Sequence, residues 1–189
     1  MHNLEPHYNW RHLYVASEDQ LSPFYGRSYS EFEFKHAIYD HWIHPQWDFI
    51  GSSTLFIKLL YANYEKGFCI IELMGEWNDC LHNDIMYLKR EIADILIENG
   101  ISRFILIGEN VLNFHAGDDD YYQEWSEDID NGWIIGINFR EHVVNEFENR
   151  NLDYYIAFGG RFNSFKWRSL DPNQLYDALN EMLMKRLNP

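Results

Sequence analysis

Side chains that can act as acids, bases or anion ligands are concentrated just after the apolar runs of this sequence. Histidine is the usual general acid or base in proteins, and arginine can hold an anionic group. Ligands of open α/β sheets bind beyond the carboxyl ends of the strands, so we expect these side chains to converge on one edge. The catalytic candidates are Glu109, His115, Arg140 and His142, and the ligand-binding candidates are Asn110, Asn113 and Arg161. The segment after residue 75 adds Glu76, Asn78, Asp79 and His82 to the same edge.

Many of these polar residues could serve the structure of the protein rather than catalysis or ligand binding. Every helix needs groups that cap its first turn, and the predicted helix starts carry Asp79, Asn138, Glu141 and Asp171. Asn138 and Glu141 together fit a capping box. The remaining candidates can also be structural, because buried polar groups at a sheet edge often bind loop backbone.

The acidic stretch FHAGDDDYYQEWSEDIDNGW raises a metal hypothesis, because carboxylate oxygens are the ligands of Mg²⁺ and Ca²⁺. Its spacing does not match an EF-hand loop, in which acids alternate around a central glycine. A short amphipathic helix fits better, with Asp118 or Asp119 as its cap and the rings of Tyr121, Tyr122 and Trp125 facing inward. We therefore expect the three consecutive aspartates to be exposed and to hold no metal.

A second cluster, HAIYDHWIH, contains His36, Asp40, His41 and His44. Imidazole and carboxylate together can bind zinc, and on a helix Asp40 would meet His36 or His44. No H-E-x-x-H motif is present, nor is a GxSxG, Walker or GxGxxG motif. We expect neither a metal nor a cofactor, and zinc stays the alternative for this cluster.

Hydrophobic patterning predicts the elements that position these side chains. STLFIKLLY and GFCIIELMGEW flank a Glu-Lys-Gly turn, so residues 53–77 predict a β-hairpin. Apolar residues at spacings of three and four predict an amphipathic helix over residues 81–99, which ends at Gly100. RFILIG, residues 103–108, predicts a strand that is buried on both faces, parallel and central.

The pattern then repeats along the chain. GWIIGIN predicts a second buried strand, followed by a helix to about Asn149. Tyr154–Phe158 is strand-like, and Asp171-Pro172-Asn173-Gln174 opens a last amphipathic helix. This alternation predicts the α/β class, with a mostly parallel central sheet opened by the hairpin and helices on its faces.

The order of these elements resembles that of the STAS domains, the SpoIIAA-like anti-sigma-factor antagonists, over roughly residues 53–187. The resemblance implies a fold. Members of that family carry an Asp-Ser-x-Gly motif with a phosphorylatable serine where a helix begins after the third strand. Here the corresponding residues are Gly108-Glu109-Asn110-Val111, without a serine, so the resemblance implies no phosphorylation switch.

Composition limits the partners and the organisation of the chain. With 30 acids against 15 bases, the net charge of −15 repels phosphates and anionic lipids, so we expect neither nucleic acid nor membrane as partner. No signal peptide or long apolar run appears, and the two cysteines, Cys69 and Cys80, lack a CxxC spacing. We expect a cytoplasmic protein with free thiols, in which an aromatic-rich extension, residues 1–48, packs on a single α/β domain, residues 49–189.

Two functions from different classes fit these features. The favoured one is a non-catalytic, acidic, soluble protein-binding or regulatory module, whose partner is another protein or a second copy of itself. Catalytic motifs are absent, and aromatic residues make up 17% of the chain. The alternative is an enzyme or small-ligand binder that uses the strand-end residues. A deep pocket containing Glu109, His115 and Arg140 would favour the alternative, and a filled, shallow edge would favour the protein-binding module.

Overall fold

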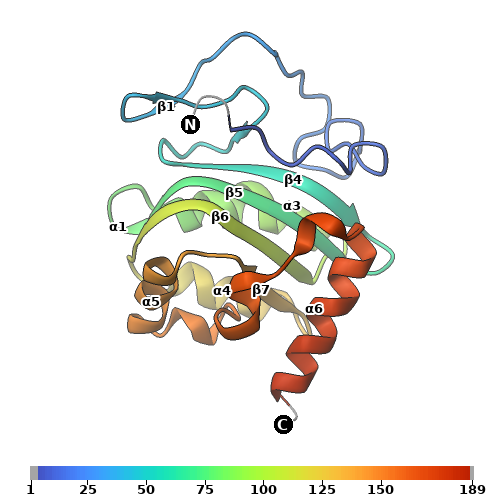
Figure 1. Cartoon of the computed structure of the whole chain (residues 1–189), viewed down its shortest axis with the longest axis vertical. Coiled ribbons are helices and arrows are strands. Elements are labelled where there is room, and N and C mark those ends of the chain that lie inside the picture. The colour runs from blue at the N-terminus through green and yellow to red at the C-terminus, as the bar shows by residue number, and fades with distance from the viewer. Residues whose placement is uncertain (1–3, 188–189) are drawn as a thin grey trace.

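The computed structural model describes residues 4–187, which form a five-stranded mixed sheet with helices on its faces (Figure 1). The strand order is β3-β4-β5-β6-β7, and a separate two-stranded sheet pairs β1 with β2. The predicted α/β class is confirmed. The strands are β1 (Ala37–Ile38), β2 (His41–Trp42), β3 (Asp48–Phe49), β4 (Leu55–Asn63), β5 (Phe68–Asn78), β6 (Arg103–His115) and β7 (Trp133–Ile137). The α-helices are α1 (Asp79–His82), α2 (Asp84–Tyr87), α3 (Asp94–Glu98), α4 (Asp120–Asp128), α5 (Glu141–Asn149) and α6 (Pro172–Leu187).

The predicted hairpin is confirmed as the antiparallel pair β4 and β5. Its register runs from Leu55 opposite Gly75 to Asn63 opposite Phe68. Gly67 in the turn has a φ of 67°, a left-handed conformation that favours glycine. Every residue of β5 is buried, as expected of a strand that has helices or other segments on both faces.

The strands β5, β6 and β7 are parallel, as predicted, with Arg103 opposite both Phe68 and Trp133. The predicted end of β6 at residue 108 is wrong, because the strand continues to His115. Two irregularities in the β5 and β6 register accompany this extension. Two of the polar residues after Gly108, Asn110 and Asn113, pair with acidic side chains of β5.

The helical region predicted over residues 81–99 is interrupted. Asn83 separates α1 from α2 in a left-handed conformation, with a φ of 52°. A π-helical segment, Leu88–Ala93, then joins α2 to α3. The apolar face is nonetheless buried as predicted, since Ile85, Leu88 and Ile92 are each at most 1% exposed.

The two faces of the sheet carry separate apolar cores. Alternate residues of β5, Cys69 and Ile71, belong to the core under α1 to α5, whereas Phe68 and Ile70 belong to the core under α6. Figure 1 shows α6 standing beside the ends of β4 to β6, with α4 and α5 grouped below them.

The N-terminal residues lie above β4 in Figure 1 and form little regular structure apart from β1, β2 and β3. The segment in which a helix would have brought Asp40 to His36 or His44 is instead a short hairpin, β1 paired with β2. Ile38, Ile43 and Trp47 from this segment pack on Phe56 of β4 and Met74 of β5 as a third apolar cluster.

Two predictions for the C-terminal part have opposite outcomes. The prediction of a strand at Tyr154–Phe158 is wrong, because residues 152–154 form a 3₁₀ turn. Ala157 makes an isolated parallel bridge with Ile135 of β7. The predicted start of α6 is confirmed: Gln174 N–H donates to Asp171 Oδ1 at 2.9 Å, and Asp171 N–H donates to Gln174 Oε1 at 3.1 Å.

Two further properties of the described chain concern its environment. Within residues 4–187, no helix is both long and apolar enough to cross a bilayer. The two cysteines are free thiols, with Cys69 buried in β5 and Cys80 exposed in α1.

Candidate functional site

The strand-end polar residues form a row across β5 and β6. Asn110 Nδ2 donates to Glu72 Oε1 at 3.3 Å, and Asn113 Nδ2 donates to Glu76 Oε1 at 3.0 Å. Both glutamates are nearly inaccessible, at 1% and 5% exposed. Glu76 is among the residues expected at this edge. Glu72 is not among them, because its only sequence signal is a single acid within an apolar strand.

Glu72 is the most deeply buried member of this row. The backbone N–H of His7, in the N-terminal segment, donates to Glu72 Oε2 at 2.8 Å. Burial raises the pKa of the Glu72 carboxyl to about 7, and the His7 hydrogen bond and the charge of Arg168 oppose this rise. The carboxyl group therefore changes its charge near neutral pH.

Glu109 is half-buried, and its pKa is lowered, whereas that of Glu72 is raised. Burial alone would raise its pKa, but hydrogen bonds from Asn138, Trp167 and Arg168 outweigh burial and hold the pKa below its usual value. Asn138 Nδ2 and Trp167 Nε1 donate to Oε1 at 2.7 and 2.8 Å, and Arg168 lies 2.5 Å from Oε2. Glu109 therefore stays ionised beside a carboxyl group that titrates near neutrality.

Rings from both ends of the chain close over this row. The centroid of the His7 ring lies 4.9 Å from that of Trp10 and 4.7 Å from that of Trp167, both in edge contacts. Trp10 Nε1 donates to the carbonyl of Leu170 at 3.1 Å. The edge around Glu72 is therefore filled by side chains.

The structure does not bring the remaining candidates to Glu109. His115 is exposed at the end of β6, and Arg140 is exposed at the N-cap of α5. His142 Nε2 lies 2.7 Å from the carbonyl oxygen of Leu112. Arg161 lines a different cavity, of about 570 Å³, beside Arg186. Five cavities of the described chain have linings that do not include Glu109, His115 or Arg140.

The predicted capping roles of Asn138 and Glu141 are wrong. Asn138 adopts a left-handed conformation with a φ of 56°, and its side chain binds Glu109 and the backbone of Phe165. Arg140 occupies the N-cap of α5, and no side chain there caps the helix. Asn138 thus joins β7 to the segment that carries Trp167.

Asp79 is not the cap of α1 either, because Asn78 takes that position and accepts from Leu81 N–H at 3.0 Å. Asp79 is buried one residue later, where it accepts from Ile85 N–H at 2.8 Å and from Tyr122 Oη at 2.5 Å. Burial raises the pKa of this carboxyl to about 7 despite these hydrogen bonds. Asp79 therefore links the start of α2 to α4.

The acidic stretch forms a helix, α4, as predicted. Tyr122 and Trp125 are fully buried, Tyr121 is half-buried, and the aspartates at 118–120 are exposed. Asp119 is at the N-cap, but its side chain makes no capping hydrogen bond, so the capping role predicted for it is wrong. The rings anchor the helix and the aspartates face outward.

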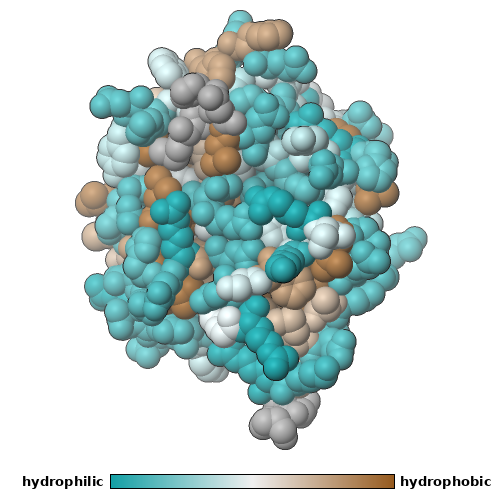
Figure 2. Space-filling model, in the orientation of Figure 1, coloured by the Kyte–Doolittle hydropathy of each residue, from teal (hydrophilic) through white to brown (hydrophobic). Residues whose placement is uncertain are grey.

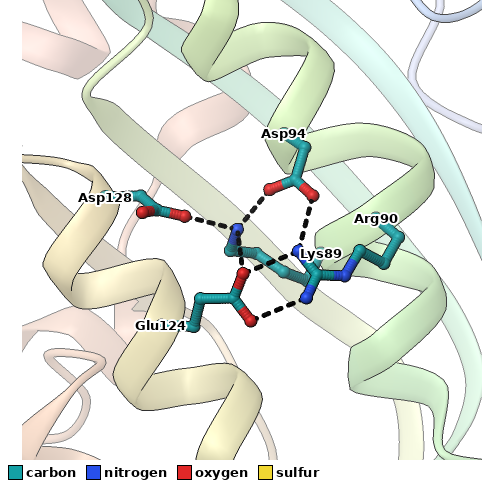
Figure 3. A network of polar contacts seen from close by, with 5 residues as sticks. All are labelled: Lys89, Arg90, Asp94, Glu124 and Asp128. Atoms are coloured by element: carbon teal, nitrogen blue, oxygen red, sulfur yellow. Dashed lines mark hydrogen bonds and ion pairs between the residues drawn. The ribbon is translucent and has the colours of Figure 1, made fainter.

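A charged network fastens α4 to the π-helical segment (Figure 3). The side chain of Lys89 is fully buried, and its Nζ donates to Asp128 at 2.7 Å and to Asp94. Burial would lower the pKa of Lys89, but the bonds to Asp128 and Asp94 outweigh it and raise the pKa. Arg90 donates two bonds to Glu124, at 2.6 and 2.8 Å. Glu124 and Asp128 of this stretch therefore bind protein cations.

The histidine cluster is dispersed over the β1–β2 hairpin. The His36 ring stacks on Phe49 with centroids 4.5 Å apart, and His44 Nε2 lies 3.5 Å from Glu5. Within residues 4–187, no group of three or more histidine, cysteine or acidic side chains has a geometry that could hold a metal ion.

Comparisons with known proteins add a weak structural likeness. No protein-family model matches the sequence, and no curated protein matches it. Among solved structures, the chain is similar to one described as the anti-sigma factor antagonist SpoIIAA in its unphosphorylated form. The two share 11% sequence identity with a TM-score of 0.42, over 56% of this chain and 89% of that chain.

Proposed function

We propose that this chain is a non-catalytic module that binds another protein through aromatic side chains of its N-terminal segment. The observation that carries the proposal is their exposure: Phe32 is 85% exposed, Tyr39 74% and Trp42 53%. Large rings exposed together are the usual anchors of protein interfaces. We call these three residues and Phe49, which is 38% exposed, the aromatic surface. In Figure 2 hydrophobic side chains project at the upper end of the molecule, over the N-terminal segment.

Local contacts hold part of the aromatic surface in place. Trp42 pairs with Ala37 across the β1–β2 hairpin. Tyr39, in the turn, donates its hydroxyl to Glu76 Oε2 at 2.7 Å while its ring stays exposed. Phe49 is stacked on His36, which directly precedes β1. Anchors that are already ordered lose less conformational entropy on binding, which favours an interface here.

Charge indicates the chemistry of the partner. The protein has a net charge of −15, and the exposed acids Glu31, Glu33 and Asp40 lie close in sequence to the rings. A basic protein with an apolar centre complements such a surface, and opposite charge accelerates its association. The partner we propose is therefore a protein with a cationic rim around apolar side chains.

The acidic side chains of the strand-end row and Glu109 bind other groups of the protein, which supports a non-catalytic role. Glu72, Glu76 and Glu109 each bind protein donors. Rings of Trp10 and Trp167 fill the space beside them. A catalytic carboxylate needs contact with substrate, whereas these three carboxylates accept hydrogen bonds from the protein itself.

The test is photo-crosslinking followed by binding to the purified partner. A photoreactive phenylalanine at position 42 should crosslink a basic protein from the native cell extract, and the same probe at position 154 should not. Trp42→Ser and Tyr39→Ser should each weaken binding to that purified partner at least about tenfold. Tyr154→Ser is the matched control, because Tyr154 is 84% exposed outside the aromatic surface, and it should change binding less than about twofold.

Equal affinity of the Trp42→Ser variant and the wild type would contradict the proposal, as would the absence of any crosslink specific to position 42. Crosslinking of the chain to itself, with sedimentation that depends on concentration and on Trp42, would replace the basic partner by a second copy.

A further inference from the structure

A cavity of about 200 Å³ lies between the N-terminal segment and β4. Its lining comes from residues 7–17, from Tyr29 and Gln46, and from residues 58–60 of β4. The aromatic and aliphatic part of the lining includes Trp10, Tyr14 and Leu60. The strand-end row does not contribute to it, so this is a separate site.

The lining is cationic although the protein is acidic. It contains Arg11 and Lys58 and no aspartate or glutamate. Behind it lies the buried Asp48, whose Oδ2 is 3.1 Å from Lys58 Nζ and whose Oδ1 is 3.3 Å from Arg27. Two other acids accept from lining residues, Asp19 from Tyr14 Oη and Glu72 from His7 N–H, both at 2.8 Å. The charged side chains of the lining itself are therefore Arg11 and Lys58, without a carboxylate beside them in the lining.

The cationic and polar groups are held in position and retain binding capacity. The side chain of Lys58 is 13% exposed, and its Nζ lies 3.6 Å from the centre of the Tyr29 ring. Arg11 donates to Gln46 Oε1 at 3.0 Å, which orients the guanidinium. His7 also lines the cavity, and within the described chain its buried Nε2 has no hydrogen-bond partner. A buried polar atom without a partner is costly unless a ligand or water satisfies it.

We propose that this cavity binds a small organic anion. Its carboxylate or phosphate would lie at Lys58 and Arg11, and a ring-sized apolar body would lie against Trp10 and Leu60. Drug-sized ligands need about 300–1,000 Å³, whereas a cavity of roughly 150 Å³ suffices for a benzene ring, so the volume suits a ligand with one ring. Arginine and lysine supply the charge-assisted hydrogen bonds that such an anion accepts.

The experiment measures binding of three probes of similar shape to the full chain. Benzoate and phenyl phosphate carry the anionic group, and benzamide is a neutral isostere of benzoate. In ligand-detected NMR and calorimetry, at least one anion should bind at least about tenfold more tightly than benzamide, because a neutral group forgoes the charge-assisted bonds. The tighter of the two anions identifies the carboxylate or the phosphate as the preferred group.

Variants locate the binding. Arg11→Met and Lys58→Met should each weaken binding of the preferred anion at least about tenfold, whereas Lys35→Met should leave it unchanged, since Lys35 is 71% exposed and outside the lining. Arg11 is exposed, so its replacement is informative even if Lys58→Met fails to fold. Equal binding of benzamide and the anions, unchanged affinity in Arg11→Met, or no binding up to about 10 mM would overturn the proposal. These outcomes do not depend on the protein partner, because no residue of the aromatic surface lines the cavity.

Discussion

Replacing Glu72 by Gln is predicted to make the stability of the protein less dependent on pH. The side chain is nearly inaccessible, and burial raises its pKa from 4.5 to about 7. An acid whose pKa rises on folding binds a proton more tightly in the folded state. Its contribution to stability is therefore fully present below pH 4.5 and is lost as the pH rises through about 7. At about 1.36 kcal/mol per pH unit, the whole loss is roughly 3 kcal/mol.

Urea unfolding at pH 5, 6, 7 and 8 measures this effect. Most of the loss falls within that range, so between pH 5 and 8 the wild type should lose roughly 2–3 kcal/mol more stability than Glu72→Gln. The side-chain amide oxygen of the variant can still accept from His7 N–H. The pKa of Asp79 is also raised to about 7, but that residue is the same in both proteins and cancels in the difference.

Glu65→Gln is the control, because Glu65 is exposed in the hairpin turn. Its stability relative to the wild type should not vary with pH. A difference between wild type and Glu72→Gln that stays constant within about 0.5 kcal/mol from pH 5 to 8 would refute the reasoning.

Three further predictions concern the helices of the opposite face, each checked by urea or thermal unfolding. Ile92→Ala should lower the free energy of unfolding by about 2–5 kcal/mol, because Ile92 is 1% exposed and its truncation leaves a cavity. A loss under about half a kcal/mol would contradict the assignment of Ile92 to the core. Lys89→Met should lower the free energy of unfolding by about 1–3 kcal/mol, because Asp94, Glu124 and Asp128 lose the cation that they share. The control is Lys166→Met: Lys166 is exposed, so this variant should stay within about half a kcal/mol of the wild type. Joint replacement of Asp118, Asp119 and Asp120 by Asn should change stability by less than about 1 kcal/mol, and neither EDTA nor Ca²⁺, Mg²⁺ or Zn²⁺ should shift the Tm. A metal-dependent rise in Tm confined to the wild type would instead establish a metal site.

The correctly predicted elements are those whose own residues carry a clear hydrophobic, turn or capping pattern. The hairpin β4–β5 has apolar strands around a glycine turn, and α6 has a capping box at Asp171 and Gln174. β7 is a continuous apolar run, and α4 has rings at spacings that reach the core. Local chemistry decides these elements, so the sequence suffices to place them.

The errors fall where partners distant in sequence decide the structure. β6 was expected to end at Gly108 because polar residues follow it, yet Asn110 pairs with Glu72, 38 residues away. Trp167 reaches Glu109 from 58 residues away, and His7 reaches Glu72 from 65. Asn138 was expected to cap a helix and instead binds Glu109. The sequence thus predicts which residue types occur near the site. It does not predict which of them meet, because their contacts join segments that are far apart in the sequence and hydrophobic periodicity carries no information about such contacts.

The contact between Trp10 and Leu170 has a consequence for the synthesis of the protein. These residues are 160 positions apart. At a translation rate of about 5–20 residues per second, the N-terminal segment waits roughly 8–30 s on the ribosome before its C-terminal partner is made. Throughout that interval Trp10 lacks its final neighbours, Trp167 and Leu170. A chaperone that binds exposed rings on nascent chains should therefore engage this segment early and leave it only after Trp167 and Leu170 have been made.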